Sequence, residues 1–220
     1  NKECIGLSHQ AAVLNKAFPL PEKTDLTGKL VLQQYAPVTA KYGFHFKAVG
    51  DKVFTPVIRS QVRNLQPTNN GHITVYLPAY DDKRLIKSLS VFPHVKWEVF
   101  SKHNKKKSVH KNITIDPINN ELFTASMASG SGVLCGGGFE TPAEALFLGK
   151  KLLVIPMKNQ FEQQLNAEAL RGMGVPVIKN LKPKYLPVIS EWLENGNVIP
   201  VEYPDITQDV VDMVVARHSK

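Results

Sequence analysis

The sequence predicts an α/β fold in which a doubly wound parallel sheet is covered by helices on both faces. From about residue 71 onward, short apolar segments alternate with longer segments of helical periodicity, a pattern typical of strand–helix–strand units. No apolar run approaches the roughly 20 residues that a membrane-spanning helix needs. The two cysteines, Cys4 and Cys135, lack metal-ligand spacing, which favours a reducing compartment. We therefore expect a globular, cytoplasmic protein.

The elements of this Rossmann-like sheet follow one another regularly along the chain. Strands are expected at 72–80, 95–102, 112–118, 132–137, 151–157 and 175–180. Helices are expected at 82–92, 120–129, 141–149, 160–174 and 184–196. In such sheets the ligand binds at the carboxyl ends of the strands, where the strand order reverses.

The first 66 residues show a different pattern. A strand and a helix are expected within 4–18, and two more strand-like pieces within 41–59. The stretch "QPTNNG" at 66–71 is rich in turn formers and predicts a junction, which divides the chain into domains at 1–66 and 67–220. Because the chain opens like the middle of a folded domain, we expect it to be truncated.

The charge of the chain favours anionic partners. Lys and Arg number 27 against 19 Asp and Glu, which gives a net charge of +8. The densest basic run, "SKHNKKKSVHK" at 101–111, has no interleaved aromatic residues, so we expect no nucleic-acid partner. A solvated connecting loop is the simpler explanation of this run, and peripheral contact with a membrane surface is the alternative.

A glycine-rich turn carries the main functional signal. Gly136, Gly137 and Gly138 follow an apolar segment and therefore lie at the carboxyl end of an expected strand. Thr141 is expected to be the N-cap of the next helix, and Glu144 stands where it can reach back to that cap. The free amides and positive dipole end of this helix would then face the glycines. A phosphate or diphosphate fits there, because glycine lets an anion approach the backbone closely.

The same residues also fit a purely structural role, in which the glycines form a tight turn and Glu144 only caps the helix. Two better-known phosphate loops are excluded. A G-x-G-x-x-G pattern from Gly136 would need glycine where Thr141 stands, and no G-K-[ST] follows any glycine.

Polar residues that follow the next expected strand are expected to face the same crevice. They are Glu162, Gln163 and Asn166, in the loop and first turn after 151–157. Side chains with several donors and acceptors beside an anion site suit the hydroxyls of a sugar joined to that phosphate. A solvated helix N-terminus is the alternative explanation.

The segment "GGGFETPAEALFLGKKLLVIPMKNQFEQQLNA" at 136–167 resembles the nucleotide-sugar-binding signature of GT-B glycosyltransferases, especially MurG-like and UDP-glycosyltransferase-like carboxyl-terminal domains. The matching positions are Gly137, Gly138, Glu144, Gly149, Pro156 and the run 162–167. The resemblance implies a donor-binding domain at 67–220, preceded by the tail of an acceptor-side domain at 1–66. It also implies that the last helix, with its apolar stripe at 210–214, returns to the first domain, although packing on its own domain would explain the stripe equally well.

The resemblance further implies roles in donor binding. Glu144 would bind the ribose hydroxyls, the backbone of Ile118 would hold the uracil, and the amides of 138–141 would hold the diphosphate. The donor sugar would contact the run 162–166. The implied donor-binding residues in these two segments are Gly137, Gly138, Phe139, Thr141, Glu162, Gln163 and Asn166.

Two segments of the amino-terminal part also resemble this family. "SHQAAVLNKAF" is similar to its His-Glu-Gln-Asn segment, so His9 is expected to line the cleft, although Ala11 stands where the family has Asn. "TPVIR" is similar to its Asn-Pro-Val-Arg segment, which would bring Arg59 near the phosphates. No catalytic base can be named from these segments.

The predicted function is transfer of a sugar from a nucleotide-sugar donor, favoured as a UDP-sugar, to an unknown acceptor that is lipid-linked or a saccharide. No D-x-D motif is present, so we expect no metal and no cofactor, with the helix N-terminus stabilising the leaving diphosphate. The fragment alone is expected to be inactive. A UDP-sugar 2-epimerase and a non-catalytic nucleotide-sugar-binding module remain as alternatives.

Overall fold

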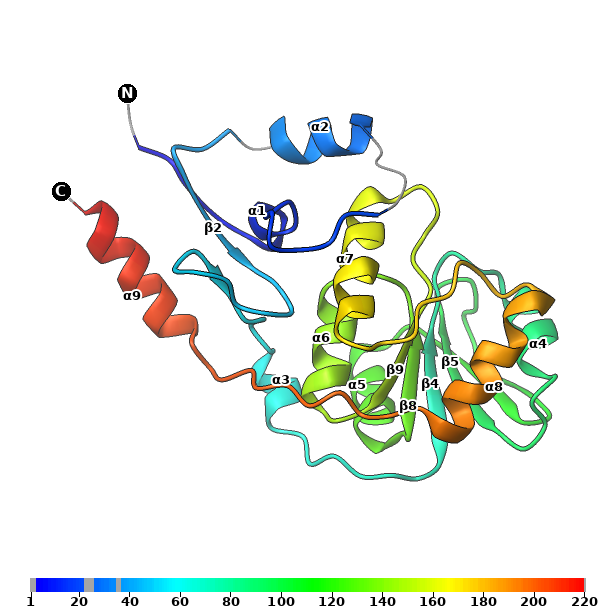
Figure 1. Ribbon diagram of the computed structural model, residues 1–220. Helices are drawn as coiled ribbons and strands as arrows, with labels where there is room; N and C mark the ends of the chain where they lie inside the picture. The colour runs from blue at the N-terminus through cyan, green and yellow to red at the C-terminus, as the bar shows by residue number, and fades with distance from the viewer. Residues whose placement is uncertain (1–2, 22–25, 35–36, 220) are drawn as a thin grey trace.

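The computed structural model describes residues 3–21, 26–34 and 37–219 of the chain. It contains two sheets of different size (Figure 1). The smaller sheet has three strands in the order β1-β2-β3, and the larger has six in the order β6-β7-β5-β4-β8-β9.

The larger sheet confirms the predicted α/β fold class. Its strands are β4 (His72–Tyr76), β5 (Lys96–Ser101), β6 (Ser108–His110), β7 (Ile113–Pro117), β8 (Gly132–Cys135) and β9 (Lys151–Val154). All neighbours pair in parallel except β6 and β7. The strand order reverses between β4 and β8, so a ligand crevice is expected at the carboxyl ends of these two strands.

Helices cover both faces of this sheet (Figure 1). They are α3 (Ser60–Arg63), α4 (Asp82–Leu89), α5 (Asn120–Ser129), α6 (Glu140–Phe147), α7 (Phe161–Gly172) and α8 (Leu186–Asn195), which follows a 3-10 turn at Pro183–Tyr185. Along β8, Val133 and Cys135 pack into the core beneath α5, α6 and α7, whereas Leu134 packs into the core beneath α4 and α8. Alternation along the strand therefore builds two apolar layers, one on each face.

The first and the last described elements of the chain lie at the smaller sheet. Its strands are β1 (Ile5–Leu7), β2 (Ala40–Phe44) and β3 (Val53–Phe54), and the helices in the same part of the chain are α1 (His9–Ala12) and α2 (Leu26–Gln34). The last helix, α9 (Thr207–His218), returns to it, as the resemblance implied (Figure 1). His218 lies 3.0 Å from the Tyr42 hydroxyl and 2.7 Å from a Glu3 carboxylate oxygen.

The chain crosses between the two sheets twice, and the crossings lie close together (Figure 1). The first runs through α3 and 64–71, and the second through 196–206. In the second crossing, the Tyr203 hydroxyl donates to the Phe46 carbonyl and the Tyr203 carbonyl accepts from Arg63 of α3, both at 3.0 Å. The crossings are therefore bonded to each other. The boundary predicted at residue 66 stays a prediction.

Two expected elements differ in the structure. The basic run was predicted to be a loop, which is wrong at its end, because β6 pairs there with β7 at the sheet edge. Charged side chains are tolerated on such an edge, and Lys111 makes the connecting turn with φ of 57°. The strand expected at 175–180 is reduced to a single bridge between Val154 and Val177.

Candidate donor-binding site

The glycine-rich turn lies where the sequence placed it, directly after β8 and beside the reversal of strand order. The start of the following helix was predicted incorrectly. Helix α6 begins at Glu140, and its N-cap is Phe139, which already has helical dihedral angles and makes no side-chain cap bond. Thr141 is therefore a residue of the first turn and not the cap.

The first turn of α6 leaves several amides free. Among the residues that the structure describes, the backbone N–H groups of Gly138, Phe139, Glu140 and Thr141 donate to no protein acceptor. These groups point out of the helix N-terminus and carry the positive end of its dipole. The arrangement suits an anion such as a phosphate.

The turn is held rigidly by α7. The Gln163 side-chain oxygen accepts from the amides of Gly137 and Met157 at 3.1 and 3.0 Å. Asn166, fully buried, donates to the Gly137 carbonyl at 3.1 Å. A Cβ at Gly137 would lie 2.5 Å from the Gln163 carbonyl oxygen, whereas a Cβ at Gly138 would have nothing within 4 Å. Gly137 thus permits close packing, and Gly138 leaves the free amides open.

Glu144 is paired with a residue far away in the sequence. Its carboxylate, with a side chain only 3% exposed, accepts from Arg59 Nε at 2.6 Å and from Arg59 Nη2 at 2.8 Å. The Glu144 carboxylate raises the pKa of Arg59, which stays charged. Glu144 makes no bond to the N-cap, so the capping role considered from the sequence is wrong.

The same arginine extends the site toward β7. Arg59 Nη1 donates to the Asn120 side chain at 2.7 Å, at the start of α5. Ile118, the residue expected to hold the uracil, lies between β7 and α5 and is half exposed. Asn120 could not be recognised from the sequence, because its partner is 61 residues away.

His9 brings the amino-terminal part onto the turn. Its ring stacks on Phe139 with centroids 3.8 Å apart, and its Nε2 lies 2.9 Å from the Asn166 side-chain oxygen. Its Nδ1 lies 2.8 Å from the Phe44 carbonyl. Burial lowers the pKa of His9, while the Phe44 carbonyl and the Glu162 carboxylate oppose this effect. Both ring nitrogens are engaged, so His9 positions Asn166.

Glu162 is a partly exposed member of the 162–166 run. Its side chain is 34% exposed, and it approaches His9 at 3.8 Å and Gln10 at 3.4 Å. The Gln163 amide, in contrast, is occupied at both ends, since its nitrogen donates to the Gln160 side chain at 2.6 Å. The structure thus brings Glu162, Gln163 and Asn166 together, with different partners.

The sequence did not indicate His45, which lies behind His9. His45 is buried, stacks on Phe18 at 3.7 Å between centroids, and accepts from the Phe46 amide at 2.9 Å. Its Nε2 has no hydrogen-bond partner among the described residues. Burial lowers the pKa of His45 to about 3, so this ring is neutral at physiological pH.

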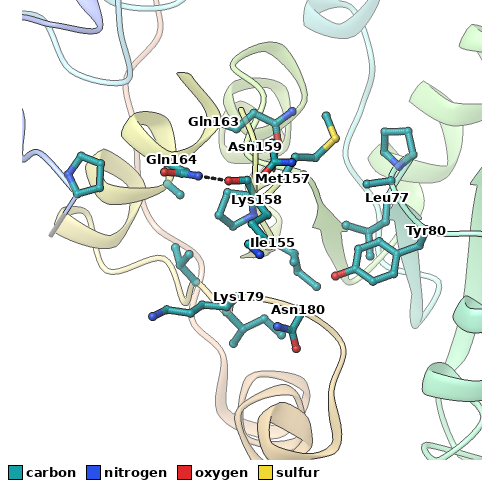
Figure 2. A pocket seen from close by; sticks show the side chains of 18 of the residues that line it. Leu77, Tyr80, Ile155, Met157, Lys158, Asn159, Gln163, Gln164, Lys179 and Asn180 are labelled. Carbon is teal, nitrogen blue, oxygen red and sulfur yellow. Dashed lines mark hydrogen bonds between the residues drawn. The ribbon is translucent and has the colours of Figure 1, made fainter. Parts of the chain in front are cut away.

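A cleft of about 1130 Å³ opens beside the turn, at the carboxyl ends of β4, β8 and β9 (Figure 2). Gly136 and Gln163 line it, which places it next to the turn. Figure 2 shows Leu77 and Tyr80 on one side of this space and the residues that follow β9 across it. The segment 177–182 closes a third side.

Comparison with known proteins identifies the family. The family model described as glycosyl transferase family 1 matches residues 22–195, which is most of the chain. The chain belongs to glycosyl transferase family 1. No curated protein sequence matches it.

Solved glycosyltransferases share the fold of this family 1 chain. The glycotransferase of kitacinnamycin matches with a TM-score of 0.50 at 14% identity, over 71% of this chain and 47% of that one. The glycosyltransferase SnogD from Streptomyces nogalater also gives a TM-score of 0.50, at 12% identity, over 91% of this chain and 55% of that one. Such low identity establishes the GT-B fold alone, and the chain spans about half the length of these structures.

Two further properties of the family 1 chain concern metals and membranes. Within residues 3–21, 26–34 and 37–219, no three His, Cys, Asp or Glu side chains are grouped so that they could hold a metal ion. Across the same described ranges, none of the helices has both the length and the apolar character needed to cross a bilayer.

Proposed function

We propose that this chain is the donor-binding part of a glycosyltransferase whose donor is a UDP-sugar. The observation that carries the proposal is the row of free amides at Gly138–Thr141, fixed by α7 at the carboxyl end of β8. A rigid row of donors at a helix N-terminus binds an anion without reorganising, and the family supplies the expectation that this anion is a nucleotide-sugar diphosphate.

The positions of the surrounding residues fit a nucleotide that lies across the edge of the sheet formed by the carboxyl ends of the strands. Strands β5 and β4 separate β7 from β8, so Ile118 lies about 14 Å from the turn at the usual strand spacing. A nucleoside joined to a diphosphate bridges such a gap. The ribose would then lie near the pair formed by Arg59 and Glu144.

In the transfer step, the bond between the anomeric carbon and the diphosphate oxygen breaks, and the diphosphate gains negative charge. Amides that already point at this oxygen stabilise the charge as it develops. Arg59, which is charged and bonded to Glu144 and Asn120, adds a further positive charge beside α5 and α6. The acceptor hydroxyl attacks the anomeric carbon, and its proton goes to a base that we do not assign to the described residues.

Valine at Gly138 is expected to weaken binding of UDP about tenfold or more without unfolding the chain. The new side chain would cover the free amides, and each lost hydrogen bond to a charged oxygen costs about 1.5–3 kcal/mol. Calorimetric titration with UDP, ADP, GDP and dTDP measures both affinity and base preference. Gly172→Val is the matched control, because a Cβ there meets no atom closer than 4.0 Å. Equal UDP affinity in wild type and Gly138→Val would contradict the proposal.

Removal of divalent metal is expected to leave UDP affinity unchanged. The proposed site holds the diphosphate through amides and Arg59, so it needs no bridging cation. Titrations with and without EDTA make the comparison. A clear loss of affinity with EDTA would show that a metal holds the diphosphate.

The proposal has three further parts: MurG-like specificity, a lipid-linked acceptor and peripheral contact with a membrane. They are supported by the signature at 136–167 and by the basic run at 101–111. Product analysis separates transfer from 2-epimerisation, because an epimerase converts the UDP-sugar without an acceptor. A chain that binds UDP-sugar without any turnover, even with its acceptor-side half present, would be a binding module.

A further inference from the structure

The cleft at the carboxyl ends of β4, β8 and β9 carries an excess of positive charge. Its lining contains five cationic side chains and one carboxylate, that of Glu168, which is paired with Arg171 at 2.7 Å. In the part of the chain that the structure describes, the remaining four form no ion pair: Arg84, Lys158, Lys179 and Lys182. A concave site lined by cations of one sign attracts and holds an anion.

These cations are separate from the amides proposed to hold the diphosphate. The cleft shares Gly136 with the glycine turn, but the residues 138–141 are not part of its lining. Helix α6 packs on the face that also bears α5 and α7, whereas Arg84 lies in the first turn of α4 on the opposite face. Lys179 and Lys182 lie in the segment that leads to α8, also on that face. The two sets of donors are therefore separate in the fold.

The cleft also offers contacts for an uncharged ring. Pro78, Met157 and Val177 are half-buried residues of its lining and present apolar surface. Asn159 and Asn180 add side-chain amides at its edge (Figure 2). Apolar surface with a few polar groups is the usual construction of a small-molecule site, and a sugar presents both C–H and hydroxyl groups.

We propose that this cleft binds a second anionic group, a carboxylate or a phosphate, carried by the transferred sugar or by the acceptor. The position beside Gly136 and Gln163 is where a group attached to the diphosphate would lie, and in this respect the inference rests on the proposed function. Lys179 extends along the edge of the cleft (Figure 2). The Arg84 guanidinium lies 4.7 Å from the centroid of the Tyr80 ring, which orients it at the same opening.

The test compares charged ligands with uncharged counterparts that share the same sugar ring. UDP-glucuronate is expected to bind about tenfold more tightly than UDP-glucose at low salt, because its carboxylate meets the unpaired cations. In the double variant Lys179→Gln/Lys182→Gln this preference should fall to about twofold or less, while affinity for UDP alone stays within about twofold. The matched control is Lys83→Gln/Lys87→Gln, which removes two exposed charges from α4 outside the cleft.

A second titration tests whether the acceptor carries the anion. Glucose 6-phosphate is titrated into the chain saturated with UDP, and glucose serves as the uncharged comparison. Binding of the phosphate in wild type that is lost in Lys179→Gln/Lys182→Gln would support the inference and assign the anion to the acceptor. Preference for UDP-glucuronate that the double variant loses would support it and assign the anion to the donor sugar.

The inference is overturned if neither charged ligand is preferred over its neutral partner, or if the double variant keeps the preference. Failure of the proposed function looks different, because UDP itself would then not bind. In that case the titration of glucose 6-phosphate into the free chain still decides whether the cleft holds an anion.

Discussion

Replacement of Arg59 by methionine is expected to lower the free energy of unfolding by about 3 kcal/mol, because it leaves the buried Glu144 carboxylate without its partner. Methionine keeps most of the apolar length of the side chain, so the loss reports the charge and its hydrogen bonds. Urea denaturation at neutral pH measures the change.

The converse replacement should cost less. In Glu144→Leu the charge left behind belongs to Arg59, whose side chain is 40% exposed and keeps its bond to Asn120. Water can hydrate that guanidinium, so we expect a loss of about 1 kcal/mol. The double variant Arg59→Met/Glu144→Leu should recover much of the loss seen in Arg59→Met, since no buried charge remains. A larger loss in Glu144→Leu than in Arg59→Met would contradict this account.

Acidification from pH 6.5 to about pH 4.5 is expected to remove about 2 kcal/mol of stability through His45. In the unfolded chain this ring binds a proton near its ordinary pKa of 6.5, whereas burial lowers its pKa to about 3 in the folded chain. The unfolded state therefore binds more protons throughout this interval, and stability falls as the pH falls. Burial also lowers the pKa of His9, which acts in the same direction.

The replacement His45→Asn keeps a side-chain acceptor for the Phe46 amide but removes the titrating ring. Stability of this variant should depend less on pH between 6.5 and about 4.5. The control is His94→Asn, at an exposed position, which should leave the acid loss intact. An unchanged pH dependence in His45→Asn would show that other groups cause the acid loss.

The elements with strong local patterns could be predicted from the sequence. The apolar run before the glycines became β8, and the polar run after the next strand became the first turns of α7, with Gln163 and Asn166 beside the turn. Each of these features depends on residues close together in the chain, and their periodicity is therefore visible in it.

The features that could not be predicted depend on residues far away in the sequence. Strand β6 has only three residues and is defined by its pairing with β7. Helix α6 starts earlier than expected, and the Glu144 carboxylate is bonded 85 residues away to Arg59 instead of to the cap. His45 is enclosed by rings from separate segments, which no local pattern reveals. Cations of the cleft likewise come from four separate segments.

The paired crossings between the two sheets restrict how the two parts of the molecule can move. Because Tyr203 of one crossing is bonded to Arg63 of the other, the two connections act together as a single hinge. A rotation that keeps both connections intact turns about an axis passing near this bonded pair. His9 and Asn166 form a separate contact between the amino-terminal part and α7, so any such rotation also has to break or preserve this hydrogen bond.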